Sequence, residues 1–430
     1  MPCKTERVGR GGFSILRRRV KGLMAVGMLV LCSCGSVTTG ATSTTPATQT
    51  PTLAPLTSTT APPTTGSPPT TGSPPTTSPP AVFASCGRGT SIADPIAPHG
   101  VFAVVSMPLT PALSAVLAKN VIPDASNCGV TINVRWADVD KGPTVKPQYD
   151  WRSVDAVAAP WLAADKVVNF AFEGVGDDVK GLASTPAYVQ AKVGMVTCSA
   201  PNTPPRNPVY WDPVYQDAYR SFQLNAVAYT NTMKTVGYLR FGIGAGTQDL
   251  PALGYRTPAC KSGWQAAGLT PAQWQSFSIS QVDFQASLVP THPVIVSVNE
   301  LDAGDLTLAN AVTAEAVQRG LGIASQTLTK ADPADIDKGQ PCTANWCALF
   351  RLVAGHVPLL LQTATATDPL GKSATGDLPT LATFGLGQKA QIFELYPDEW
   401  TLANDPMAKG YQQYHQSQHD ALTALAATVG

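Results

Sequence analysis

Val167-Val168-Asn169-Phe170-Ala171-Phe172-Glu173 is the most informative run of this 430-residue chain. Successive side chains of a β-strand point to opposite faces of the sheet. Val168, Phe170 and Phe172 therefore share one face, whereas Asn169, Ala171 and Glu173 share the other. This pattern predicts a strand whose apolar face packs against helices and whose polar face points into an interior.

Seven further β-branched or apolar runs resemble it, so that the eight predicted strands cover residues 101–107, 130–136, 167–172, 238–243, 294–298, 321–324, 358–361 and 390–395. Helical stretches are predicted between most of them, at 150–164, 213–234, 271–288, 306–319 and 378–385. Alternating strands and helices favour parallel pairing through right-handed crossovers. Eight such units predict a (β/α)8 TIM barrel over 81–430. An open doubly wound sheet is the alternative, although no Gly-x-Gly-x-x-Gly turn supports it.

The same alternation predicts which polar side chains point into the barrel near the carboxyl ends of the strands, where barrel active sites are built. These are Asn133, Arg135, Arg240, Gln248, Ser297, Asn299, Gln326, Gln362, Glu394 and Tyr396, together with Asn169 and Glu173. Buried polar groups cost free energy unless they are satisfied. Their concentration here therefore predicts a site rather than a plain core.

Three segments resemble glycoside hydrolase clan A barrels, including beta-galactosidase-like members. They are the segment 134–170, the turn at 185–189 (Thr-Pro-Ala-Tyr-Val) and the last strand at 392–396 (Ile-Phe-Glu-Leu-Tyr). The resemblance implies O-glycosyl hydrolysis by two Glu residues, at the ends of strands four and seven. This sequence has Gln248 and Gln362 at those places, and an amide cannot donate a catalytic proton.

Other carboxylates are the candidate catalytic residues, because glycoside hydrolysis needs two carboxyl groups that flank the bond. Glu394 and Glu173 are predicted to point inward, on strands three steps apart in a closed barrel. Glu300 follows Asn299 on the fifth predicted strand. If the strand count is wrong by one, this strand is the fourth, and Glu300 is then the catalytic acid that the resemblance implies there. Alternatively, Glu394 is a structural partner of Arg135 or Arg240, Glu173 is likewise structural, and Glu300 and Asp249 are solvated loop carboxylates.

The chain is thus predicted to be a cell-surface glycoside hydrolase-like barrel that acts on a carbohydrate or cell-wall glycan. The alternative is a non-catalytic glycan-binding lipoprotein on a degenerate barrel. A solute-binding receptor is disfavoured because nothing marks a hinge between two lobes. The predicted substrate-binding residues are Arg135, Trp136, Asn169, Gln248, Asp249, Asn299, Gln326, Gln362 and Tyr396. Tyr188 is a further sugar-contacting candidate, whereas Trp151 is expected in the core.

The first residues predict export. A basic segment precedes an apolar run at 23–31, which is too short to span a bilayer but is typical of a signal peptide. Leu31-Cys32-Ser33-Cys34 resembles the lipobox of bacterial lipoproteins. The resemblance implies a signal peptide at 1–33 and acylation of Cys34, for instance with palmitate, at the outer face of the cell membrane. The alternative is plain secretion with cleavage elsewhere.

Residues 34–80 are rich in Thr, Pro and Ser, and they predict a disordered linker because they have little to bury. An exported domain with six cysteines beyond this linker predicts three disulfides. We expect neighbours to pair, as Cys86–Cys128, Cys198–Cys260 and Cys342–Cys347. These three bonds together make one of the 15 possible connectivities of six cysteines.

Composition argues against other classes. The formal net charge is zero and charged residues make up 13% of the chain, against about 25% in an average protein. With no basic patch after residue 21, nucleic-acid binding is not expected. No zinc-like Cys/His spacing occurs, so we expect no metal and no cofactor. A monomer that meets the membrane only through its lipid anchor is expected.

Overall fold

Eight parallel strands close into a barrel, as predicted. The computed structural model describes residue 86 and residues 98–175, 184–198, 206–330, 346–405 and 412–429. The barrel strands are β1 (Gly100–Ser106), β2 (Gly129–Arg135), β3 (Val167–Glu173), β6 (Val236–Phe241), β7 (Val294–Ser297), β8 (Gly322–Leu328), β9 (Leu359–Thr363) and β10 (Ile392–Leu395). Their order around the barrel is β1-β10-β9-β8-β7-β6-β3-β2. The pair β1–β10, in which Gly100 lies opposite Ile392, closes the ring and excludes the open-sheet alternative.

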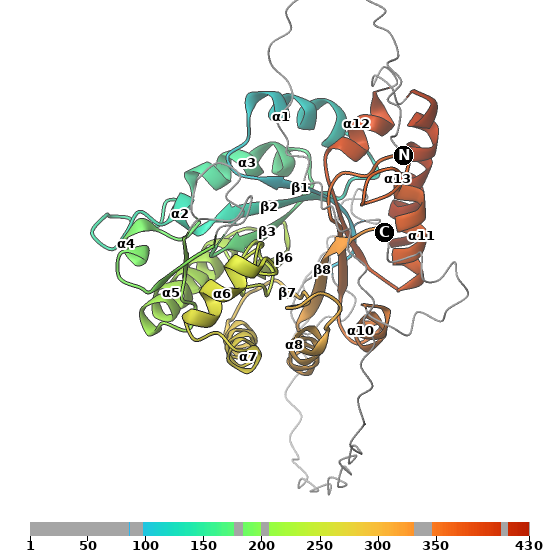
Figure 1. Ribbon diagram of the computed structural model, residues 1–430. Helices are drawn as coiled ribbons and strands as arrows, with labels where there is room; N and C mark the ends of the chain where they lie inside the picture. Colours follow the sequence, from blue (N-terminus) through green and yellow to red (C-terminus); the bar gives the residue numbers. More distant parts are fainter. Residues whose placement is uncertain are drawn as a thin grey trace, which may run out of the picture. The chain divides into compact units, whose positions relative to one another are not determined.

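Helices follow the strands and lie outside them (Figure 1). They are α1 (Pro111–Val116), the π-helix η2 (Leu117–Val121), α2 (Trp136–Val139), α3 (Arg152–Ala163), α4 (Ala187–Gln190), α5 (Pro213–Thr230), α6 (Pro258–Ala266), α7 (Pro271–Ser287), α8 (Thr307–Gln318), α10 (Trp346–Val353), α11 (Leu378–Gly387), α12 (Asp398–Asn404), the 3-10 helix η3 (Gln412–Tyr414) and α13 (His415–Val429). A short antiparallel pair, β4 (Met195–Thr197) with β5 (Arg206–Pro208), lies apart from the barrel.

Local signals set where the long helices begin. Asp212 accepts a hydrogen bond from the backbone N–H of Val214 in front of α5, and a proline follows it at the first turn. Thr270 caps α7 in the same way through the N–H of Gln273. A capping oxygen satisfies one of the free N–H groups at a helix start, and proline tolerates that position because its own N–H is missing.

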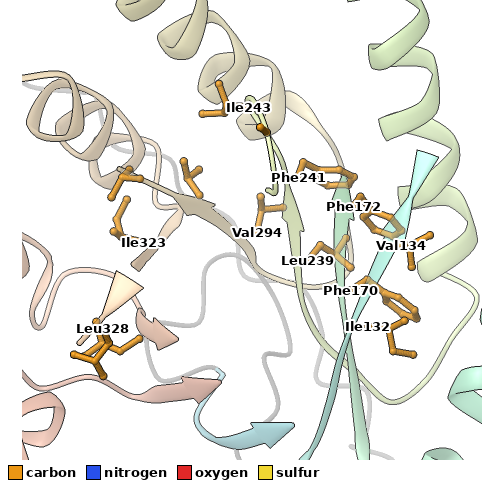
Figure 2. Close-up of a cluster of buried hydrophobic side chains, with 14 of the residues drawn as sticks. Ile132, Val134, Phe170, Phe172, Leu239, Phe241, Ile243, Val294, Ile323 and Leu328 are labelled. Carbon is orange, nitrogen blue, oxygen red and sulfur yellow. The ribbon is translucent and has the colours of Figure 1, made fainter. Parts of the chain in front are cut away.

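The core has an outer and an inner part, as the alternation predicts. Side chains on the outer face of the strands, together with Ile243 just after β6, pack under the helices. Figure 2 labels ten of them: Ile132, Val134, Phe170, Phe172, Leu239, Phe241, Ile243, Val294, Ile323 and Leu328. A separate apolar cluster fills the barrel near the amino ends of its strands, and includes Phe102, Val167, Tyr238, Ile295, Ala324, Leu360 and Ile392. The interior at this end is therefore a packed floor and not a channel.

Two of the predicted disulfides, Cys86–Cys128 and Cys198–Cys260, are present. The first joins the inner cluster and covers the floor of the barrel. Cys347 is disulfide-bonded, but Cys342 lies outside the described residues, so this pairing stays a prediction. The predicted signal peptide, Cys34 and the 34–80 linker also lie outside them. Among the residues that the structure does describe, no helix has the length and apolarity to cross a membrane.

Candidate functional site

A layer of polar side chains lies above the apolar floor, inside the barrel. It is formed by inward positions of the strands, and includes Thr131, Asn169, Arg240, Ser297, Gln326, Gln362 and Glu394. All of these side chains are buried. The predicted alternation therefore placed the polar layer correctly, and the contacts within it determine what each residue can do.

Glu394 and Arg240 form an ion pair at the centre of this layer. Glu394 Oε2 lies 2.9 Å from Arg240 Nη2, and both side chains are fully buried. The Tyr238 hydroxyl donates to Glu394 Oε1 at 2.6 Å and lies 2.7 Å from Thr131 Oγ1. Burial raises the pKa of Tyr238 well above its ordinary value, so this hydroxyl remains a donor. Glu394 thus has the structural partner that the sequence left as an alternative.

Two glutamines complete the surroundings of Arg240. Gln362 Oε1 lies 3.4 Å from both terminal nitrogens of Arg240. The Gln326 amide satisfies its neighbours when its oxygen faces Arg240: the oxygen then accepts from Arg240 Nη1 and, at 2.6 Å, from Thr247 Oγ1. Its nitrogen then donates to the Gly246 carbonyl at 3.1 Å. Both glutamines therefore face the buried guanidinium. They lie at the base of the mouth, by which we mean the opening of the barrel at the carboxyl ends of its strands.

The loop after β6 is tightly folded above these two glutamines. A side chain at Gly244 would meet the carbonyl oxygen of Leu250 at 1.9 Å, so only glycine fits there. Thr247 has a positive φ of 61°, which is uncommon for a residue that is not glycine. Strained backbone of this kind is frequent at ligand sites. The loop brings Gln248 to the rim, where its side-chain oxygen accepts a hydrogen bond from Asn299 Nδ2.

Asn299 links the loop after β6 to the loop after β7. Its Oδ1 accepts from Arg256 Nη2 at 3.3 Å and from the backbone N–H of Glu300 at 2.8 Å. Glu300 is partly exposed, and its Oε2 accepts from the N–H of Gly304. Because β7 is the fifth strand of the barrel, the strand count was right and the interpretation that places Glu300 on strand four is wrong.

The remaining acids differ in exposure. Glu173 ends β3, is 9% exposed, and lies in register with Arg135 on β2. Asp249 is fully buried, and among the described residues neither of its carboxyl oxygens forms a well-directed hydrogen bond. Burial raises its pKa well above the ordinary value, and the nearby N–H of Asn299 and the charge of Arg256 offset this only in part. Asp249 is therefore a buried carboxyl group whose pKa lies well above its ordinary value.

Other predicted residues lie in different places. Arg135 is near the rim and pairs with Asp138 through two hydrogen bonds of 2.9 and 2.8 Å. Asn169 is fully buried and accepts from the N–H of Tyr238. Tyr396 is partly exposed, after β10. Trp136 needs correction: it is fully buried under the helices, where it stacks on Phe222, and so does not reach the mouth.

The sequence reasoning passed over Tyr238 and Thr247. Tyr238 is the inward neighbour of Arg240 by the same alternation, so that rule could have identified it. Thr247 could not be found in this way, because its role depends on the loop conformation. Within the part of the chain that the structure describes, no group of three or more His, Cys, Asp or Glu side chains is placed to hold a metal ion.

No protein-family model matches the sequence, and no curated protein matches it. Among solved structures, the chain is similar to the catalytic domain of a beta-amylase from Paenibacillus polymyxa, with a TM-score of 0.47, 13% identity, and 74% of this chain and 98% of that chain covered. It is also similar to a glycoside hydrolase family 10 endo-beta-1,4-xylanase from Gloeophyllum trabeum, with a TM-score of 0.45, 13% identity and coverage of 78% and 99%. It is similar as well to a beta-galactosidase from the psychrophilic Marinomonas ef1, with a TM-score of 0.45 and 9% identity. That match covers 76% of this chain and 59% of that chain.

Proposed function

We propose that this barrel binds a carbohydrate at its mouth and does not hydrolyse glycosidic bonds through Glu394. The observation that carries the proposal is the fully buried ion pair of Glu394 with Arg240. A glycosidase needs two carboxyl groups that face the scissile bond. The carboxylate of Glu394 is instead held by Arg240 and Tyr238 below the mouth, where a sugar has no access to it.

The rim supports binding by its chemistry. Gln248 and Asn299 are neutral amides that join two loops above the buried layer; Gln248 is partly exposed, whereas Asn299 is 5% exposed and holds Gln248 in place. An amide offers both donors and acceptors for sugar hydroxyl groups but does not ionise. Arg135, beside the rim, adds a guanidinium group that pairs with Asp138, on a side chain that is 15% exposed. This set of groups suits recognition of hydroxyl groups better than acid-base chemistry.

A second candidate is a glycosidase that uses Glu173 and Asp249. Glu173 is the more exposed of the two and ends a strand, and Asp249 has the raised pKa that a general acid needs. Asp249 has no exposed surface, so hydrolysis by this pair requires the loop after β6 to open.

Binding and hydrolysis of a panel of oligosaccharides, measured by calorimetry and by reducing-end release, tests both candidates. Gln248→Ala and Asn299→Ala should each weaken binding at the mouth about tenfold, because a lost hydrogen bond costs about 0.5–1.5 kcal/mol and each exchange also disturbs its partner. Gln318→Ala, at an exposed position of α8, is the matched control. Unchanged affinity in both rim variants would contradict the mouth site. Hydrolysis by the wild type that Glu173→Gln abolishes would establish the second candidate.

We further propose that the barrel is exported and anchored by an acylated Cys34 at the outer face of the cell membrane. The basic segment, the apolar run and the Leu-Cys-Ser-Cys motif at 31–34 support this proposal. A Thr/Pro-rich linker at 34–80 would then hold the domain away from the membrane and within reach of cell-wall glycans.

A further inference from the structure

Two adjoining cavities lie on the outer wall of the barrel, away from the mouth. Their volumes are about 470 and 490 Å³, and they share Gln148, Tyr149, Asn225 and Ala228. Tyr188 lines one end, and Trp151 with Tyr229 lines the other. We call them together the aromatic groove. Each volume is within the range of about 300–1,000 Å³ that is usual for small-ligand sites.

The aromatic rings of the groove are held rigidly by hydrogen bonds at their polar edges. The Tyr188 hydroxyl donates to Asp140 at 2.8 Å, and that of Tyr229 donates to Asp155 at 2.7 Å. Trp151 stacks on Tyr229 with a centroid distance of 4.3 Å and an interplanar angle of 5°. The hydroxyl groups of Tyr188 and Tyr229 are therefore already paired, and the stacked rings of Trp151 and Tyr229 each leave at most one face for a ligand.

The lining is uncharged throughout: each side chain along both cavities is an amide, a hydroxyl, a phenol, an indole or an apolar group. Burial raises the pKa of Tyr149, Tyr188 and Tyr229, so these phenols stay neutral. Asn225 Oδ1 accepts from Trp151 Nε1 at 3.1 Å, and its Nδ2 makes no hydrogen bond to any described residue. The groove therefore combines fixed aromatic faces with a donor that is still available.

We infer that the aromatic groove is a second carbohydrate site, which binds a segment of a neutral oligosaccharide. A sugar ring has one face of C–H bonds, whose hydrogens are weakly positive, and an edge of hydroxyl groups. The face of an aromatic ring is the negative part of its quadrupole and attracts such hydrogens. The hydroxyl edge then meets the Asn225 amide. A charged ligand would find no opposite charge along the lining, and a second cavity beside the first leaves room for an adjacent sugar unit.

This site goes beyond the proposed function, because it uses none of the residues of the mouth. Calorimetric titration with maltohexaose, cellohexaose, xylohexaose and hexa-N-acetylchitohexaose tests it. Ala228→Arg places a long charged side chain from exposed helix surface into both cavities and should weaken binding at least tenfold. Asn225→Asp keeps the acceptor for Trp151 but removes the free donor, and should weaken binding several-fold. Ala314→Arg, the same exchange at an exposed position of α8, should bind like the wild type.

The mouth variant Gln248→Ala separates the two sites. Loss of binding in Ala228→Arg, with binding retained in Gln248→Ala, supports the groove whatever the mouth does. The groove is overturned if Ala228→Arg binds every sugar as tightly as the wild type does. If Gln248→Ala then loses that binding, the sugar binds at the mouth. No binding of any of the four sugars by the wild type also overturns the groove.

Discussion

Glu399 should make the stability of this domain depend on pH. Its carboxyl group is fully buried at the start of α12. The backbone N–H of Thr367, in the loop after β9, donates to Oε1 at 2.6 Å, and the Thr367 hydroxyl donates to Oε2 at 2.5 Å. Gln418 of α13 also donates to Oε2. One carboxyl group thus connects three segments near the carboxyl end of the barrel.

Burial raises the pKa of Glu399 from its ordinary value of 4.5 to about 7, and the neighbouring Asp398 adds to the rise while the hydrogen bonds oppose it. The folded chain then holds this proton between about pH 4.5 and 7, where the unfolded chain has released it. The folded state binds more protons, so stability falls as pH rises through this window. At about 1.36 kcal/mol per pKa unit, the full loss is about 3 kcal/mol.

The difference in unfolding free energy between the wild type and Glu399→Gln isolates this effect, because the amide does not titrate. Urea unfolding at pH 4, 5, 6, 7 and 8 should show the wild type losing about 3 kcal/mol relative to the variant between the lowest and highest pH. Glu315→Gln is the control: it removes a partly exposed carboxylate from α8 and should change stability by under about 1 kcal/mol. Two parallel curves for wild type and Glu399→Gln would refute the reasoning.

Three further outcomes are expected. Cys34→Ala should move the protein from the membrane fraction to the soluble fraction, and an unchanged distribution would contradict lipid anchoring. Glu394→Gln leaves the Arg240 guanidinium buried without its counter-ion and should lower the unfolding free energy by about 3–5 kcal/mol, whereas the apolar double variant Arg240→Met with Glu394→Leu should recover most of it. A single variant as stable as the wild type would show that the pair is not structural. Peptide mapping under non-reducing conditions should recover Cys342 joined to Cys347, and alkylation of both as free thiols would exclude that bond.

The barrel was predictable because its signal is local. Each strand is a short apolar run that alternates or is β-branched, and the run at 167–173 alone predicts which side chains face the helices. The strands β4 and β5 were not predicted, because three residues are too few to establish an alternation. The short helices α2 and α4 were missed for the same reason, since four residues make about one turn.

The site was predictable only in part. Alternation placed Glu394 and Arg240 inside the barrel, but which charges meet there depends on how far the strands are staggered around the ring. Sequence therefore left Arg135 and Arg240 as equal partners for Glu394, and the structure pairs it with Arg240. Trp136 was assigned to the mouth because it follows β2, yet it lies on the outer face by the same alternation and is buried there.

The buried charge pair and the partly exposed Gln248 at the rim are connected by a series of polar contacts. Glu394 pairs with Arg240, whose guanidinium faces the oxygen of Gln326, and this oxygen also accepts from Thr247 in the loop after β6. Gln248, the next residue along the chain, accepts a hydrogen bond from the amide of Asn299. A buried ion pair is weak evidence for stability, because apolar replacements often match it. Its position here gives it a different consequence: the charge of Arg240 orients the amides beneath the strained loop, and the loop presents the groups that a ligand at the mouth would contact.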